Sequence, residues 1–458
     1  MAEAAAAASM GATDAYSAFH GHFDAGRYGA AVPYARRVLE LAEKQSPDPT
    51  AEDVQVALMN LATSEYLADD YVAAEASFLR AIELVQSSGR PLNDRLARAY
   101  GGLASAYHDG QRHDLAVKNF EQAVGLTRRH DGLLTERQLP LLEQYVDSLT
   151  ELGRYQEALQ GQRYILRIVT RKYGENSVEL APTLEKIGRW YANVGAYDQS
   201  RRLLKQAMQI VETAEGPNSL RLVPLLAALA ACDRQQLLDP AQQVLAVQDP
   251  DRTAMFREPG VIPIAYSPQL LLNEGEKSLL RAVQIAEDGA ETAPLRVVEV
   301  RTQLGDWYQS GNQPERALPH YQRAWTAASR VTALVQGKSV VEALYGQPVL
   351  LQLTRPDGWK RYAERQPEQI EVRNVIVQVT VNAQGRVEKP QVLDDSGDPK
   401  RAERTVDALK STARYRPRIE GGDPVPTQVT FSQPWTVLLP PPESAPAGAT
   451  TDKGQAGK

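Results

Sequence analysis

The sequence contains little of what disulfide-rich proteins, metalloproteins and most enzyme families need. Cys232 is the only cysteine in 458 residues, so no disulfide can form within the chain. The six histidines form no His-Glu-x-x-His motif, and paired Cys-x-x-Cys and calcium-loop spacings are missing. No Gly-x-Ser-x-Gly elbow, phosphate loop or Gly-x-Gly-x-x-Gly motif occurs. We therefore predict that the protein is not an enzyme and uses no metal or other cofactor.

Long apolar runs and a strong net charge are missing as well. No run approaches the roughly 18–20 apolar residues that a membrane-spanning helix needs. The formal net charge of −6 disfavours general nucleic-acid binding, so we expect no nucleic-acid partner. One stretch departs from this average, because residues 400–418 hold seven basic and two acidic side chains. It is either a solvated helix face or an anion-binding patch.

The N-terminal segment, MAEAAAAASMGATDA, is rich in alanine and has Glu3 where a signal peptide would carry a basic residue. It resembles the small-residue stretch around a signal-peptide cleavage site. We expect residues 1–15 to be flexible and the protein to lie in the periplasm, with its signal sequence removed. The alternative is a cytoplasmic protein.

A repeat with a period of 42 residues dominates the first three quarters of the chain. Each unit reads as an amphipathic helix, a short break and a second helix, as in 61–82, 103–124 and 187–208. The residues just after the breaks are separated by 43, 42, 42 and 42 positions: Tyr28, Tyr71, His113, Tyr155 and Tyr197. Small side chains recur three positions later, at Ala31, Ala74, Ala116, Ala158 and Ser200. Small residues let paired helices approach closely, and bulky residues such as Phe78, Phe120 and Leu204 would fill the gap to the next pair.

This pattern resembles the tetratricopeptide repeat. The first helices carry that family's Gly/Ala-x-x-Tyr motif, at Gly188 and Tyr191, Ala104 and Tyr107, and Gly305 and Tyr308. The 42-residue spacing resembles the longer-loop repeats of kinesin light chains. The resemblance implies a mainly α protein in which residues 16–335 form a right-handed α-solenoid of about seven helix-turn-helix units.

The register breaks after the fifth unit. The next clear unit, at 304–325, leaves 33 residues more than two repeats require. We predict the two helices of the intervening unit at 220–232 and 279–287, with the extra residues forming a loop near 234–268. The five prolines of this loop exclude one regular helix. Such an insertion is either a binding loop or a tolerated surface loop.

Beyond Ser329 the pattern changes from helical to extended. The segment VIVQVTVNAQGRVEKPQVL, at 375–393, alternates valine with polar residues on both sides of a turn, which predicts a β-hairpin. A helix is expected from Asp398-Pro399 to about Ser411, and a final strand at 427–439.

This order of elements resembles the C-terminal domain of TonB-type energy transducers. The matching motifs are DDSGDP before the helix, RYRP after it and PVP before the last strand. We therefore predict a small α+β domain at 345–439, followed by a disordered tail at 440–458.

Both resemblances imply surfaces that bind proteins. In tetratricopeptide arrays the first helices line a concave face, and the family's contact positions fall on Tyr66, His108, Glu143, Asp147, Glu185, Arg189, Asn193 and Asp306. The set leans acidic, so a basic or polar peptide is expected. In the TonB family the last strand offers an edge to a partner's extended segment, and the matching contact residues are Gln428, Thr430 and Phe431. Pro434 favours the alternative of a purely structural edge.

The leading hypothesis is a non-enzymatic scaffold of the bacterial cell envelope that binds proteins or peptides. Partners would bind the concave repeat face and, by strand addition, the C-terminal domain, and they could include segments of outer-membrane receptors. One alternative is a TonB-like energy transducer or transporter-coupling protein. Another is an enzyme with an unrecognised site in the 234–268 insertion.

Overall fold

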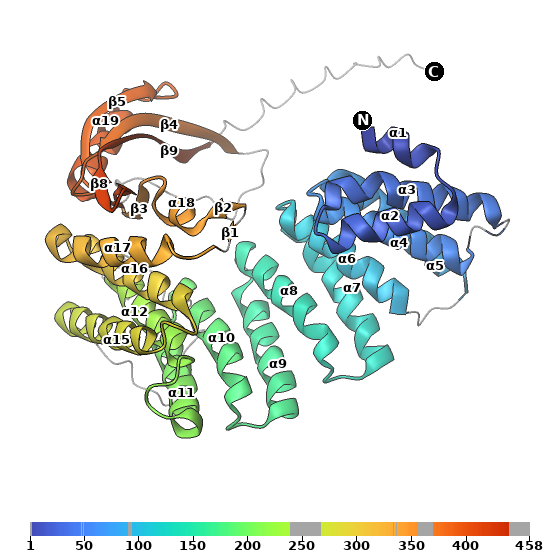
Figure 1. Cartoon of the computed structure of the whole chain (residues 1–458), viewed down its shortest axis with the longest axis horizontal. Helices are drawn as coiled ribbons and strands as arrows, with labels where there is room; N and C mark the ends of the chain where they lie inside the picture. Colours follow the sequence, from blue (N-terminus) through green and yellow to red (C-terminus); the bar gives the residue numbers. More distant parts are fainter. Residues whose placement is uncertain are drawn as a thin grey trace, which may run out of the picture. The chain divides into compact units, whose positions relative to one another are not determined.

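The computed structural model describes residues 2–46, 48, 50–89, 94–238, 267–332, 334–335, 337–354 and 370–438. The chain divides into two compact units, Met1–Ile187 and Gly188–Lys458. The predicted architecture, a mainly α solenoid followed by a small α+β domain, is confirmed (Figure 1). Among the described residues, no helix is both long and apolar enough to cross a membrane.

The first unit is helical. Its helices are α1 (Ala2–Ala8), α2 (Ala12–Asp24), α3 (Tyr28–Gln45), α4 (Glu52–Leu67), α5 (Tyr71–Ser87), α6 (Asp94–Asp109), α7 (His113–Asp131), α8 (Leu139–Glu151) and α9 (Tyr155–Tyr173). Consecutive helices pack as antiparallel pairs, beginning with α2 and α3. Helix α1 and the start of α2 fall in the segment for which the sequence predicts flexibility. Helix α10 (Ala181–Asn193) runs across the boundary between the two units in the sequence.

The break within each of the first five helix pairs has a common backbone geometry. Residues two positions before the second helix adopt positive φ, at Gly26, Asp69, Gln111, Gly153 and Gly195. The next residue donates its N–H to a carbonyl five positions back, as Arg112 does to Tyr107 at 2.8 Å. This is the hydrogen bond that ends a helix in a Schellman motif. The second helices therefore begin at the five residues that the 42-residue spacing singles out.

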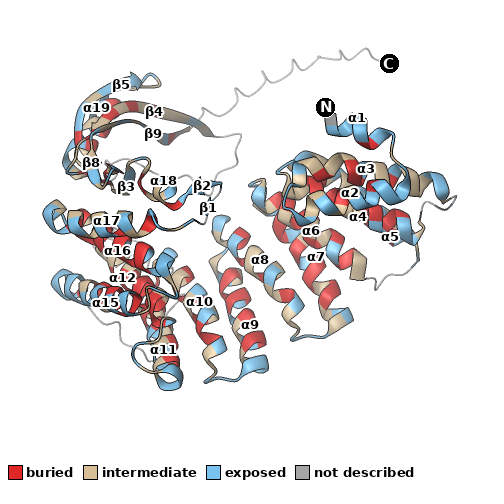
Figure 2. Ribbon diagram, in the orientation of Figure 1, coloured by how far each residue is buried: buried red, intermediate tan, exposed pale blue. Residues whose placement is uncertain are grey.

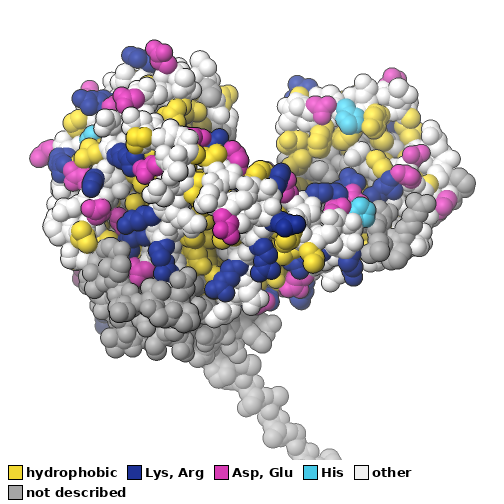
Figure 3. Space-filling view, turned by 90° about the horizontal axis from the view of Figure 1, so that it is seen from below, with side chains coloured by type: hydrophobic (Ala, Val, Ile, Leu, Met, Phe, Trp, Pro, Cys, Tyr) yellow, Lys and Arg dark blue, Asp and Glu magenta, His cyan; other side chains and the backbone are white. Residues whose placement is uncertain are grey.

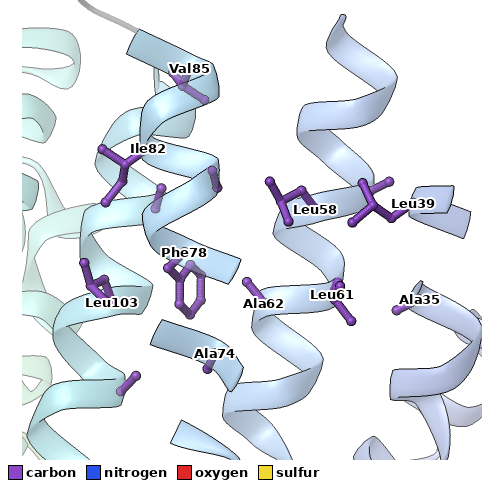
Figure 4. Packing of buried hydrophobic residues seen from close by; sticks show 14 of the residues in the cluster. Ala35, Leu39, Leu58, Leu61, Ala62, Ala74, Phe78, Ile82, Val85 and Leu103 are labelled. Carbon is purple, nitrogen blue, oxygen red and sulfur yellow. The ribbon is translucent and has the colours of Figure 1, made fainter. Parts of the chain in front are cut away.

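Buried residues recur along the helices where these pack together, and exposed residues lie between them and at the helix ends (Figure 2). Phe78 of α5 is 2% exposed and lies among Ala62, Ala74 and Leu103 (Figure 4). A Cβ atom placed on Gly102 of α6 would lie only 2.3 Å from the Phe78 ring. The ring therefore fills the gap between one pair and the next, as predicted. Leu204 differs, because the glycine that it covers, Gly188, belongs to its own pair.

The second unit continues the helix pairs. It contains α11 (Tyr197–Glu215), α12 (Leu222–Leu238), α15 (Pro268–Asp288), α16 (Pro294–Ser310) and α17 (Pro314–Ala328). Helices α12 and α15 pack against each other, as expected for one repeat interrupted between its two helices. Residues 239–266, which make up most of the predicted insertion, lie outside the described residues.

The C-terminal part of the second unit holds a three-stranded antiparallel sheet with the order β5-β4-β9. Its strands are β4 (Ile370–Val381), β5 (Val387–Asp394) and β9 (Thr427–Leu438), and helix α19 (Pro399–Thr412) packs on one face. Alternation places four fully buried valines of β4 on that face, Val375, Val377, Val379 and Val381, opposite Ala402 and Leu409. The sheet is thus the one that the alternating valines predict. The predicted tail at 440–458 lies outside the described residues.

Shorter elements connect this sheet to the last helix pair. Strand β3 (Val349–Gln352) pairs with β6 (Arg414–Arg416), β7 (Arg418–Glu420) with β8 (Asp423–Val425), and β1 (Leu334–Val335) with β2 (Lys338–Ser339). The short helix α18 (Val340–Tyr345) contacts α17, and Val340 joins Val298 and Ala328 in a small buried cluster. Strands β3 and β6 both contact α16.

Candidate protein-interaction sites

Five of the predicted concave-face residues lie in the first unit, and each sits on the first helix of a pair. The Tyr66 hydroxyl donates to Asp109 at 2.7 Å, and burial, followed by this contact, raises the pKa of Tyr66. His108 shares a hydrogen bond of 2.8 Å with the Ser148 hydroxyl. Tyr66 and His108 are therefore held in place from neighbouring helices.

The acidic members of the set share one region. Glu143 forms an ion pair of 2.8 Å with Lys186, and Glu185 is half-buried one position before that lysine. Asp147 has an exposed side chain, yet the surrounding protein displaces enough water to raise its pKa. The Glu143 carboxylate raises it further, whereas His108 opposes the shift. This part of the first unit would bind a cationic or hydrogen-bonding group more favourably than an anion.

Three predicted residues lie in the second unit and differ in their surroundings. Asn193 is exposed and accepts a hydrogen bond of 3.2 Å from Gln235. Arg189 donates to the Pro224 carbonyl at 3.3 Å. Asp306, expected to meet a partner, is only 7% exposed and is engaged by the chain's own C-terminal domain.

The ion pair between Asp306 of α16 and Arg416 of β6 is the centre of that contact. Arg416 Nε lies 2.9 Å from Asp306 Oδ1, and Arg416 Nη2 lies 2.7 Å from Oδ2. The Tyr321 hydroxyl also donates to Oδ1, at 2.9 Å, and Arg416 Nη1 donates to the Leu344 carbonyl at 2.8 Å. Burial disfavours the arginine charge, but Asp306 outweighs it and raises the pKa of Arg416.

Hydrogen bonds around the ion pair join the last helix pair to the hairpin turn. Gln309 of α16 donates to the Gln384 carbonyl at 2.7 Å. Gly385, with φ of +70°, lies so close to Tyr415 that a Cβ would come within 2.0 Å of the Tyr415 carbonyl oxygen. Gly385 therefore allows both the positive φ of the hairpin turn and the close approach of this turn to β6. The C-terminal domain and the last helix pair share one buried polar junction.

The predicted edge residues lie on β9. Within the part of the chain that the structure describes, β9 pairs with β4 on one side only. Gln428 and Thr430 are exposed, whereas Phe431 is half-buried and packs toward the sheet's core. Gln428 and Thr430 are therefore available to contact an added strand, and Phe431 supports the sheet.

A pocket of about 220 Å³ in the second unit is lined by residues of helices α10, α12, α15 and α16. Its apolar lining is Ala227, Ala230, Ala231, Leu279 and Trp307, and its polar lining is Arg189, Arg234, Gln303 and Asp306. Two predicted contact residues, Arg189 and Asp306, thus meet at one hollow. Sequence reasoning did not single out Arg234 or Arg416, although RYRP was noted as a motif.

Charge on one face of the molecule has no single sign. Basic and acidic side chains intermingle on the face seen in Figure 3. The described residues also include surface ion pairs, such as Arg154 with Glu157 at 2.7 Å. Recognition by charge should therefore depend on local sites rather than on a long-range field.

Two family models match separate parts of the chain. Tetratricopeptide repeats match residues 53–129 and 138–213, and the C-terminal domain of the Gram-negative bacterial TonB protein matches residues 360–436. The chain therefore contains tetratricopeptide repeats and, after them, a domain that matches the TonB C-terminal domain. Both resemblances expected from the sequence are confirmed, and the TonB match contains the Arg416 junction and most of β9.

Solved structures with similar repeats share little sequence with the chain. The kinesin-light-chain-like, nearly identical TPR-like repeats of Podosopora anserina are 15% identical over 45% of this chain and 97% of that chain, with a TM-score of 0.40. BtubC from P. vanneervenii is 17% identical over 52% of this chain and 97% of that chain, with a TM-score of 0.37. The quorum sensor NprR from B. thuringiensis is 17% identical over 68% and 85%, with a TM-score of 0.35. Comparison with curated proteins finds no match.

A histidine in the last tetratricopeptide pair should make the second unit sensitive to acid. Burial, followed by the positive charges of Arg301, Arg323 and Arg316, lowers the pKa of His320 from 6.5 to about 4, and Glu287 opposes this shift. The Arg301 guanidinium donates to His320 Nδ1 at 3.2 Å, which requires an unprotonated Nδ1. Between the two pKa values the unfolded chain binds more protons than the folded chain, so stability falls as pH falls through this window.

We expect the free energy of unfolding of the second unit to fall by about 2 kcal/mol from this group between pH 7 and pH 4. His320→Gln should remove that part of the pH dependence, whereas the exposed His130→Gln should keep it. All five tryptophans lie at or beyond Trp190, so tryptophan fluorescence during urea unfolding reports on the second unit. Equal pH dependence in both variants would contradict the prediction.

Proposed function

We propose that this protein is a non-enzymatic scaffold of the bacterial cell envelope, located in the periplasm. It binds partner proteins through the first helices of its repeats and by adding a partner's extended segment to β9. The observation that carries the proposal is the combination of a tetratricopeptide array with a TonB C-terminal domain whose last strand, among the described residues, is paired on one side only. Recovery of no partner above background in a pull-down from envelope extract would count against it.

The edge of β9 suits strand addition over a limited length. Half of the backbone N–H and C=O groups of an edge strand point away from its neighbour and can pair with a new strand. Pro434 has no N–H, so an added strand can form a regular ladder of backbone hydrogen bonds only along residues 427–433. Thr430 and Gln428 then supply exposed side chains for selectivity.

Strand addition can be tested with an extended peptide from an outer-membrane receptor. Titration should move the backbone amide resonances of residues 427–433 in the full chain. N-methylation of alternate peptide residues should abolish binding in one register and spare it in the other, because only one set of N–H groups faces β9. Thr430→Lys should weaken binding severalfold, and the control Gln391→Lys on the opposite edge strand β5 should not. Unmoved resonances at 427–433 would refute strand addition.

The second candidate function is TonB-like energy transduction or coupling to an outer-membrane transporter. The specific observation in its favour is that the TonB match covers the sheet and its edge. A transducer depends on β9 for every partner, so Thr430→Lys should weaken the capture of every partner from envelope extract severalfold. A scaffold should lose only the strand-adding partner and keep those bound by the repeats.

A further inference from the structure

The seven basic side chains of residues 400–418 differ in their surroundings. Three of them form ion pairs, Arg401 with Asp398, Arg416 with Asp306 and Arg418 with Glu420. Three more are exposed on α19: Lys400, Arg404 and Lys410. The seventh, Arg414 of β6, is half-buried and forms no ion pair with any acidic residue that the structure describes. Most of the stretch is therefore either solvated or neutralised within the chain, and Arg414 is neither.

A second arginine, Arg386, lies just before β5 on the segment that faces Arg414. The backbone N–H of Tyr415 donates to the Gly385 carbonyl at 2.9 Å, and each arginine is one residue away from this hydrogen bond. Burial, followed by the positive charge of Arg386, lowers the pKa of Arg414, and no described carboxylate counters the shift. Like charges on adjacent extended segments repel each other. The two guanidiniums are thus close together, and their charges are not balanced by the described residues.

Neutral oxygens hold both guanidiniums in place. Arg414 Nη1 donates to the Ala413 carbonyl at 2.8 Å and to the Ser411 carbonyl at 3.2 Å. Arg386 Nη2 donates to Oδ1 of Asn312, in the turn between α16 and α17. A guanidinium has five N–H donors, so each arginine keeps donors beyond these contacts. Both side chains are therefore oriented in advance and can still bind an anion.

We propose that Arg386 and Arg414 together bind a phosphate group where the TonB C-terminal domain meets the last helix pair. Two guanidinium charges are matched by a phosphate monoester, which carries about −1.5 to −2 at pH 7, whereas a carboxylate supplies only one negative charge. The planar fork of arginine also fits phosphate oxygens two at a time. The group can be free phosphate or the headgroup of a membrane lipid. This site is separate from the β9 edge and from the repeat faces, so it does not depend on the proposed scaffold function.

Inorganic phosphate, titrated into the full chain at constant ionic strength, is the first probe. With isotope-labelled arginine, the Nε–H resonances of Arg386 and Arg414 report on the site, and each is assigned by its loss in Arg386→Gln or Arg414→Gln. We expect both resonances to shift saturably. Acetate should bind at least about tenfold more weakly, because it lacks the second charge and the additional oxygens for charge-assisted hydrogen bonds.

Each variant keeps one reporter, so the contribution of the other arginine is measured directly. Arg386→Gln should weaken phosphate binding at least about tenfold at the Arg414 resonance, and Arg414→Gln should do the same at the Arg386 resonance. The control Arg296→Gln removes a surface ion pair with Glu299 on α16 and should leave the affinity unchanged. If Arg414→Gln does not fold, Arg386→Gln alone decides, because its side chain contacts only the Asn312 amide.

Vesicles of phosphatidylcholine, with and without phosphatidic acid, distinguish the two sources of the phosphate group. Cosedimentation that requires phosphatidic acid and is weakened by Arg386→Gln indicates a lipid headgroup. Saturable binding of inorganic phosphate without cosedimentation indicates a soluble phosphate compound. Equal binding of acetate and phosphate, unchanged phosphate affinity in Arg386→Gln, or no saturable shift with phosphate would overturn the assignment. These results are independent of the envelope pull-down that tests the scaffold.

Discussion

Replacing Arg416 with methionine is expected to lower the free energy of unfolding of the second unit by about 3–5 kcal/mol, because the change leaves a buried carboxylate without its cation. Asp306 is 7% exposed and Arg416 8% exposed, so water cannot replace the lost partner without opening the junction. Urea unfolding followed by tryptophan fluorescence measures the loss. Amide hydrogen exchange in residues 370–438 should also accelerate, since the TonB C-terminal domain loses its main contact with α16.

Two comparisons separate this effect from a general loss of charge. Arg418 lies two residues after Arg416 and forms a surface ion pair with Glu420. Arg418→Met removes this pair and should change the free energy of unfolding by less than about 1 kcal/mol. The double variant Asp306→Leu with Arg416→Met removes both buried charges and should recover most of the lost stability. If Arg416→Met proves as mild as Arg418→Met, the junction does not hold the domain on the last repeat.

The local pattern of the sequence was sufficient to predict the helix pairs. Five second helices, α3, α5, α7, α9 and α11, begin two residues after a left-handed backbone position, and the 42-residue spacing keeps those positions in step. The alternating valines of β4 predicted its buried face for a similar reason. Alternate side chains of a strand point to the same face, so the valines form the one apolar face that can pack against α19. These are properties of neighbouring residues, and a single sequence contains them.

The junction and the pocket could not be predicted in the same way. Asp306 lies on a first helix, but its ion-pair partner Arg416 lies 110 residues further along the chain. Nothing local to either residue indicates the pairing, which depends on how the domain packs against α16. The pocket likewise takes its lining from four helices, and Arg234 resembles any other helix-surface arginine until α16 is placed beside it.

The first unit offers an equally large effect at Phe78. Phe78→Ala should lower the free energy of unfolding of that unit by about 3–5 kcal/mol, because it empties a filled space between two helix pairs. Leu79 is the matched control, since its side chain is 44% exposed and Leu79→Ala should cost less than about 0.5 kcal/mol. The first unit contains no tryptophan, so far-ultraviolet circular dichroism during urea unfolding, with hydrogen exchange to locate the loss, measures both.

Gly102→Ala tests the same packing, because the sign of its effect on the stability of the first unit should depend on which side chain occupies position 78. In the native chain a Cβ at position 102 would meet the Phe78 ring at 2.3 Å, so Gly102→Ala should destabilise the first unit. In the Phe78→Ala background the same methyl enters the vacated space, and alanine favours the helix over glycine by about 1 kcal/mol. Gly102→Ala should therefore stabilise that variant. The same sign in both backgrounds would mean that the Phe78 ring does not lie against α6, and that adjacent repeats are joined by other contacts.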